Sequence, residues 1–329
     1  MPDARSTGGR RQRIIARLLQ SLVVVWAAAT LTFALMRLAP GDPYSRPLDG
    51  AGLSKAAADA LRAQRGLDQP MLVQYVRWLG LLARGNLGWS TMQQRPVAHV
   101  LREALPRTIG LMSLALVTSL AAGMALGTWQ GSRVGTVGDE AASTVSLVVY
   151  SLPEFWLGML LLQLFAQELQ WLPAGGIVAP THEYLPFGER LQDRARHLVL
   201  PWLTLSLVGT ALFSRFQRAS MREAWREAHV RTARAKGLPP WRVRWHAWRT
   251  ALTPVIGLAG LTFPSLLGGA VLVERLFAWP GMGHATVAAV SARDYDLVTA
   301  AVLLGSAMTV VGTLLADLLQ RRLDPRVAT

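Results

Sequence analysis

The residues best suited to recognition lie between Ser220 and Gly237, in the stretch SMREAWREAHVRTARAKG. Arginines recur there at helical spacing, so the stretch is predicted to form one basic amphipathic helix. Arginine and lysine side chains donate charge-assisted hydrogen bonds to acidic groups. The chemistry to expect from this segment is docking by charge and shape, with no covalent bond made or broken.

The predicted helix has two unlike faces. Its small, mostly apolar face comprises Met221, Ala224, Trp225, Ala228, Thr232 and Ala235. Its charged face comprises Arg222, Glu223, Arg226, Glu227, Arg231 and Arg234. Gly237 is expected to end the helix, because Pro239–Pro240 prevents its continuation, and a second basic helix is expected from Trp241 to Thr250. These residues leave three interpretations open: a helix on anionic lipid, a solvated connector, or a helix seated in a groove of a soluble protein.

Residue patterns for catalysis and nucleotide binding do not occur in the sequence. The chain has two lysines, Lys55 and Lys236, and neither belongs to a Gly-x-x-x-x-Gly-Lys-Ser/Thr loop. Its six histidines show no metal-binding pairs, cysteine is absent, and no Gly-x-Ser-x-Gly elbow occurs. The sequence therefore predicts no catalytic residues, no metal and no cofactor on this chain.

Glu154 is the carboxylate closest to the interior of an apolar segment. Secondary transporters place such carboxylates at the membrane midplane as proton relays. Because Glu154 stands alone beside Pro153, we interpret it as a structural or pathway-lining group. A proton-coupled secondary transporter stays open as the alternative function.

The composition indicates a polytopic all-α membrane protein. Only 16% of residues are charged and 51% are hydrophobic, whereas soluble domains carry about 25% charged residues. Apolar runs of about 20 residues are long enough to cross a bilayer, and backbone groups in lipid require helices. Six transmembrane helices are predicted, at 14–38, 106–130, 143–168, 198–217, 251–274 and 297–319.

The chain is accordingly divided into three parts. Residues 1–38 are a cytoplasmic N-terminus and an uncleaved first span, and 39–104 form a small extracytoplasmic helical loop domain. Residues 105–329 form a core of five spans that includes a cytoplasmic loop, 218–250. Within 39–104, helices are expected at 54–62 and 74–79.

Positive charge fixes the predicted orientation. Loop 218–250 alone carries nine basic residues, which are Arg218, Arg222, Arg226, Arg231, Arg234, Lys236, Arg242, Arg244 and Arg249. Because cytoplasmic segments are enriched in arginine and lysine, this loop and both termini are placed in the cytoplasm. The net charge of +14 is assigned to topology for the same reason, and nucleic acid is not expected as a partner.

Four sequence blocks, in order, resemble permeases of ABC importers of the dipeptide/oligopeptide/nickel class. The run 230–238 (VRTARAKGL), followed by His246–Ala247 and 251–254, is similar to their cytoplasmic "EAA" loop. The other blocks are 37–43; 66–70 with 74–75 and 85–88; and 277–283 with 293–295 and 323–326. Arg231-Thr232-Ala233 stands where the wider family has Glu-Ala-Ala, and Pro254 lies farther from Gly237. The peptide class resembles the chain in both departures.

This resemblance implies a type I ABC-importer permease fold and half of an ATP-driven translocation pathway, in a prokaryotic inner or plasma membrane. The implied partners are a second homologous permease, two cytoplasmic ATPases that hold ATP and Mg, and an extracytoplasmic substrate-binding protein. Peptides are the expected substrate, ahead of a related small solute such as a nickel chelate. The residues expected to contact an ATPase are Ala224, Ala228, Arg231, Thr232, Ala233, Lys236 and Gly237. The turn 279–283 is expected to be structural.

Overall fold

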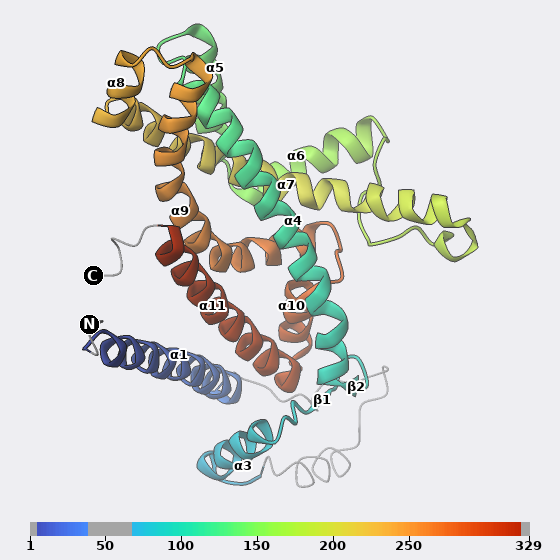
Figure 1. Ribbon diagram of the computed structural model, residues 1–329. Helices are drawn as coiled ribbons and strands as arrows, with labels where there is room; N and C mark the ends of the chain where they lie inside the picture. The colour runs from blue at the N-terminus through green and yellow to red at the C-terminus, as the bar shows by residue number, and fades with distance from the viewer. Residues whose placement is uncertain (1–4, 39–67, 324–329) are drawn as a thin grey trace. The chain divides into compact units, whose positions relative to one another are not determined.

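The computed structural model describes residues 5–38 and 68–323, and these are mostly helical (Figure 1). Within the described ranges, the strands are a short antiparallel pair, β1 (Trp89–Ser90) and β2 (Arg95–Pro96). The prediction of an all-α membrane protein is therefore confirmed. The helix expected at 54–62 lies outside the described residues.

One compact unit comprises Met1–Ala104 and Ala285–Val310. It holds α1 (Arg5–Leu38) and α3 (Met71–Ala83), which contains the helix predicted at 74–79. Phe33 of α1 stacks on Trp78 of α3 with ring centroids 5.1 Å apart, and Thr30 Oγ1 lies 2.7 Å from the hydroxyl of Tyr75. Aromatic stacking thus joins α3 to the first predicted span.

The second unit comprises Leu105–His284 and Val311–Thr329. Its helices, together with those that cross the unit boundary, are α4 (Val97–Gly131), α5 (Val137–Ser151), α6 (Glu154–Leu162), α7 (Phe187–Ala224), α8 (Ala228–Ala235), α9 (Pro240–Leu276), α10 (Met282–Ala292) and α11 (Tyr295–Leu323). A π-helical turn at Gln163–Glu168 follows α6, and a 3₁₀ turn at His182–Tyr184 precedes α7. A core of Leu111, Leu200, Leu205, Val273 and Phe277 joins α4, α7 and α9.

Glycines allow α4 to approach α7 closely. Gly123, Gly127 and Gly131 recur every four residues and therefore share one face of α4. A methyl group at Gly127 would overlap the carbonyl oxygen of Ser214 and lie 2.7 Å from Gln217 Cβ. Small residues at such spacing let helix backbones pack together within membranes.

Four helices among the described residues are long and apolar enough to cross a membrane. They are Leu19–Leu38 within α1, α4, α7 and Tyr295–Leu315 within α11. A bent pair, α5 with the helix that begins at Glu154, makes a fifth if it counts as one span. The segment predicted at 251–274 lies within α9, and the count of six spans stays a prediction.

The span predicted at 143–168 is not one continuous helix. The chain bends by 102° between α5 and α6, at Leu152 and Pro153. Leu152 is extended, with φ −77° and ψ 137°. A residue before proline is driven out of the helical region by the proline ring, and proline has no N–H to continue the hydrogen-bond ladder. The break therefore follows from Pro153 itself.

Candidate docking surface

The helix predicted from Ser220 to Gly237 is in fact two helices. α7 ends at Ala224, and α8 begins at Ala228 after Glu227 adopts an extended conformation. At the break, the indole N–H of Trp225 donates to the carbonyl oxygen of Gly131, 3.1 Å away. After this turn α8 packs against α7 and α9, and its Val230 and Ala233 are buried.

A cluster of small apolar residues holds α8 in place. Its buried members come from α7, α8 and α9 and are Met221, Ala224, Val230, Ala233, Val243, Ala247 and Ala251. Leu238, Trp225 and Trp248 pack around them and are partly buried. Close-packed side chains are nearly incompressible, so a displacement of α8 is passed to the helices it contacts. These are the end of α7 and the start of α9. Figure 1 shows α8 as a short helix beside the start of α9.

Gly237 ends α8 as predicted. Its φ of +69° is left-handed, and its N–H donates to the carbonyl oxygen of Arg234 at 2.9 Å. The N–H of Leu238 donates to the carbonyl oxygen of Ala233 at 3.3 Å. These two bonds are the pair of a Schellman cap, and Leu238 adds its usual apolar contact. Pro240 then occupies the first turn of α9, which runs on without a break through the second predicted basic helix.

The seven residues expected to contact an ATPase fall into two groups by burial. Ala224 and Ala233 are buried in the cluster and face the chain itself. The other five are exposed: Ala228, Arg231, Thr232, Lys236 and Gly237. We call these five the α8 surface.

The predicted apolar stripe does not run along one continuous face, because the helix is broken between Ala224 and Ala228. Ala228, Thr232 and Ala235 are exposed, whereas Val230 and Ala233 are buried. The break at 225–227 rotates α8 relative to α7, so one helical wheel cannot describe both. The sequence did contain a clue to the buried side of α8, because Val230 is the single large apolar residue between Ala228 and Ala235.

A cationic groove adjoins the α8 surface. It has a volume of about 590 Å³, and its lining includes Trp225, Arg234, Leu238 and Arg244. The Arg234 guanidinium lies 4.7 Å from the centre of the Trp225 ring, a cation–π contact. The residues that line the groove include no carboxylate. An acidic side chain from outside the chain would therefore meet complementary charge here.

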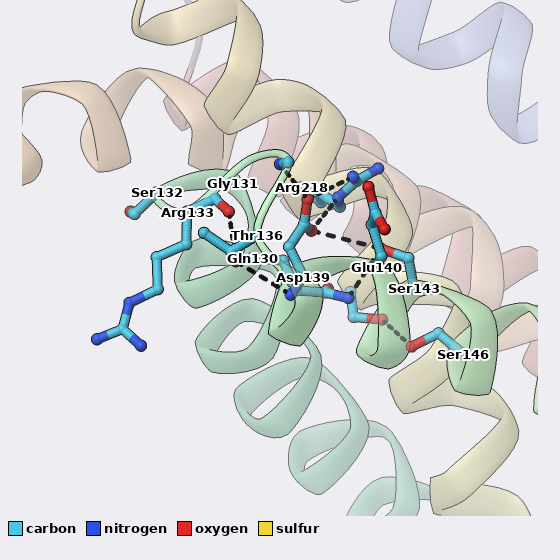
Figure 2. Close-up of polar contacts among 12 residues, drawn as sticks. Gln130, Gly131, Ser132, Arg133, Thr136, Asp139, Glu140, Ser143, Ser146 and Arg218 are labelled. Atoms are coloured by element: carbon cyan, nitrogen blue, oxygen red, sulfur yellow. Dashed lines mark hydrogen bonds and ion pairs between the residues drawn. The ribbon is translucent and has the colours of Figure 1, made fainter.

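One ion pair that the sequence did not predict supports α7 near the α8 surface (Figure 2). Arg218 donates to both oxygens of Asp139, with Nε–Oδ1 2.6 Å and Nη2–Oδ2 2.7 Å. Asp139 is fully buried and also accepts from the N–H of Gly135 at 3.1 Å. Thr136 caps α5 by accepting from the N–H of Asp139 at 3.3 Å. The α4–α5 turn is thereby tied to α7, close to where α8 begins.

The turn 279–283 is built into the core of its unit. Trp279 and Met282 are buried, and the N–H of Met282 donates to Thr108 Oγ1 at 2.8 Å. Thr108 in turn donates to the buried carboxylate of Glu274 at 2.5 Å. This arrangement agrees with the expected structural role. Glu154 begins α6 and is half-buried.

Comparison with known proteins defines the class. Residues 121–329 match the family described as "Binding-protein-dependent transport system inner membrane component", and residues 11–112 match its N-terminal region. A solved amino acid ABC transporter shares the fold with a TM-score of 0.50 at 15% identity, over 68% of this chain and 94% of that one. The chain belongs to this family, so it is a membrane-spanning permease subunit of an ABC transport system and not the catalytic subunit.

Curated relatives align over almost the whole chain. The oligopeptide transport system permease protein AppB of Bacillus subtilis is 34% identical over 316 residues, covering 95% of this chain and 98% of the relative. The di/tripeptide transport system permease protein DppB of Pseudomonas aeruginosa is 37% identical over 329 residues, with 95% and 98% covered. A putative peptide permease protein of Brucella ovis is 37% identical over 314 residues, with 94% and 97% covered.

Proposed function

We propose that this chain forms half of the translocation pathway of an ATP-driven peptide importer and receives the power stroke through the α8 surface. Peptide is favoured as substrate because relatives that align over 95% of the chain carry oligopeptide and di/tripeptide permease names. A related small solute, such as a nickel chelate, is the next class. The alternative of a proton-coupled secondary transporter loses support, because transport in this family is powered by ATP hydrolysis on partner subunits.

The docking proposal depends on one observation above all. Exposed Arg231 lies on α8 and exposed Lys236 follows directly after it. The inner side of this short helix, Val230 and Ala233, is packed against α7 and α9. When a bound protein partner moves such a helix, α7 and α9 move with it as a rigid body. Ala224 and Ala233 are positioning residues in this scheme.

The proposed partners follow from the same scheme. Two cytoplasmic ATPases would carry ATP and Mg, a second homologous permease would complete the pathway, and an extracytoplasmic protein would deliver substrate. We place loop 218–250 and both termini in the cytoplasm of a prokaryotic cell, with 39–104 outside. The density of arginine in 218–250 supports this orientation.

The test is capture of the cognate ATPase by the full-length permease in detergent. Arg231→Glu combined with Lys236→Glu should abolish capture while membrane insertion stays intact, because like charges oppose an acidic partner surface. Arg194→Glu is the matched control, since Arg194 is also an exposed arginine of the same unit but lies near the start of α7. Undiminished capture by the double variant would overturn the docking proposal.

Substrate class needs a separate measurement. Proteoliposomes that hold the permease pair, the ATPases and the cognate binding protein should accumulate a labelled dipeptide or oligopeptide only when ATP is enclosed with the ATPases. Uptake of a nickel chelate with no peptide uptake would contradict the peptide proposal and leave the docking proposal standing.

A further inference from the structure

A pocket of about 530 Å³ lies between α5 and α7, within the second unit. Its lining includes Ser143, Leu147 and Tyr150 of α5, and Leu212, Arg215 and Ala219 of α7. Each set follows the spacing i, i+3 or i+4, and i+7, so each forms one face of its helix. Pockets that bind small molecules have volumes of about 300–1,000 Å³ and combine apolar walls with a few polar groups. We call this site the α5–α7 pocket.

α7 packs against α4 through a different face. A methyl group on Gly127 of α4 would lie 2.7 Å from Gln217 Cβ, and one on Gly131 would lie 2.5 Å from Met221 Cβ. Gln217 and Met221 are fully buried, whereas Arg215 is exposed. Among the described residues, the packing of α7 on α4 therefore leaves the face that carries Arg215 open toward the α5–α7 pocket.

Arg215 brings a positive charge into this pocket from within an apolar helix. Its guanidinium lies 5.3 Å from the centre of the Tyr150 ring, and Tyr150 lies eleven residues beyond Asp139 on α5. Arg218, one turn later on α7, instead reaches Asp139 in the first turn of α5. The two arginines thus contact different levels of α5, and Arg215 contacts the level farther from the end of α7. Both helices belong to segments that are apolar enough to cross a membrane.

The charge of Arg215 is not neutralised by the described part of the chain. The ion pairs found there do not include Arg215, and the described residues that line the pocket include no carboxylate. Charged side chains within membrane spans are costly, and they usually face a cavity or a pathway where an opposite charge can pair with them. Arginines that bind lipid head groups extend toward the membrane surface. Arg215 is held beside Tyr150, deeper than the Arg218–Asp139 pair, so its place favours a ligand inside the pocket.

The chemistry of the pocket matches the carboxylate end of a peptide. Arginine binds a carboxylate through two parallel hydrogen bonds, and a free C-terminal carboxylate is common to peptides of every sequence. Ser143 and Tyr150 add hydroxyl groups, whereas Leu147 and Leu212 give the pocket apolar walls. The helix also breaks at Leu152, two residues after Tyr150, and broken helices line the substrate sites of several transporter folds.

We propose that Arg215 binds the C-terminal carboxylate of the transported peptide in the α5–α7 pocket. Tyr150 holds the guanidinium in place through its cation–π contact, and the apolar walls accept peptide side chains without selecting a sequence. This inference rests on the proposed function, because it takes its ligand from the peptide-importer assignment. It adds a specificity-determining residue on the pathway, apart from the α8 surface.

The test uses a thiol placed in the pocket. The chain contains no cysteine, so Leu147→Cys supplies the one thiol of this subunit. The assembled transporter in phosphatidylcholine nanodiscs is treated with a water-soluble maleimide, which reacts with the thiolate and therefore requires water in the pocket. Trialanine should slow the labelling of this subunit. Trialanine amide should give the same protection only at about tenfold or higher concentration, because it lacks the charged acceptor of a hydrogen bond.

Variants made in the Leu147→Cys chain assign the difference to the arginine. Arg215→Gln should remove the difference between the two peptides, whereas Arg215→Lys should retain part of it because the charge remains. Arg222→Gln is the matched control and should keep the full difference. Arg222 is also exposed on α7, seven residues after Arg215, and it does not line the pocket. The comparison of the two peptides needs no arginine variant to fold.

Three results would overturn the inference. The first is equal protection by trialanine and its amide, and the second is a thiol that does not react at all, which would indicate a dry face. The third is protection by phosphatidylglycerol in the nanodisc with none by peptide, which would assign the pocket to lipid phosphate. The uptake assay on the same preparation separates this inference from the proposed function. Peptide uptake without protection overturns the pocket assignment alone, whereas no peptide uptake overturns the peptide-importer proposal.

Discussion

Arg218 and Asp139 form a bidentate ion pair between α7 and the start of α5, with both bonds at 2.7 Å or less. The carboxylate is fully buried, whereas the arginine side chain keeps 25% of its surface exposed. Arg218 lies six residues before the end of α7, and Asp139 lies in the first turn of α5. The pair therefore braces the helix that leads into α8.

Removing the arginine should strongly destabilise this unit. Arg218→Leu removes the charged partner of Asp139, and a hydrogen bond to a charged group contributes about 1.5–3 kcal/mol. The free energy of unfolding, measured with denaturant in detergent, should fall by that order. Arg215→Gln is the control, because Arg215 is exposed and has a cation–π contact with Tyr150 at 5.3 Å, worth about 0.5–1 kcal/mol.

Replacing both partners should recover much of the lost stability. Asp139→Leu/Arg218→Leu removes the stranded charge, and apolar replacement of a whole ion pair is often neutral. A double variant as unstable as Arg218→Leu would show that the loss arises from packing and not from the unpaired carboxylate.

The glycine face of α4 makes a second prediction. Gly127→Val should cost about 1–3 kcal/mol or more, because overpacking forces two backbones apart and the obstructing atoms include the Ser214 carbonyl. Gly110→Ala, in the same helix, has nothing within 4 Å of its new methyl group and should be neutral or slightly stabilising. Thermal unfolding in detergent compares the two. Equal melting temperatures for both variants would contradict close packing of α4 on α7.

The left-handed conformation of Gly237 makes a third prediction. Gly237→Val should weaken ATPase capture, because a left-handed residue with a side chain costs about 1–2 kcal/mol and the strain falls on the cap of α8. Gly237→Asn should retain more capture, since asparagine tolerates this conformation. Open space surrounds Gly237, so a clash within the chain does not explain either result. If valine and asparagine have the same effect, backbone conformation is not the cause.

The link between β1 and the start of α11 makes a fourth prediction. Ser90 Oγ donates to Asp294 Oδ2 at 2.5 Å, and the N–H of Met92 donates to the same oxygen at 3.1 Å. Ser90→Ala should cost about 1.5–3 kcal/mol, the range for a hydrogen bond to a charged group. Protection of the Met92 amide from hydrogen exchange should fall as well. An unchanged exchange rate at Met92 would show that the turn is held by other contacts.

The sequence alone determined the membrane class, most helix positions and the end of α8. Hydrophobic length is a property of consecutive residues, and so is the glycine–proline signal at 237–240. Hydrophobic length acts through the solvent, and the glycine–proline signal acts through local backbone geometry. Both can therefore be interpreted without knowing which distant residues are in contact. The resemblance to ABC-importer permeases also came from linear blocks, and the family match confirmed it.

Only the tertiary structure decided which side of the basic segment is free. The turn at Trp225 depends on a hydrogen bond to Gly131, 94 positions away, and this turn buries Val230 and Ala233 while it exposes Ala228 and Thr232. The Asp139–Arg218 pair likewise joins residues 79 positions apart. Side-chain spacing along one helix cannot reveal such partners, because burial depends on which other helices are packed against it.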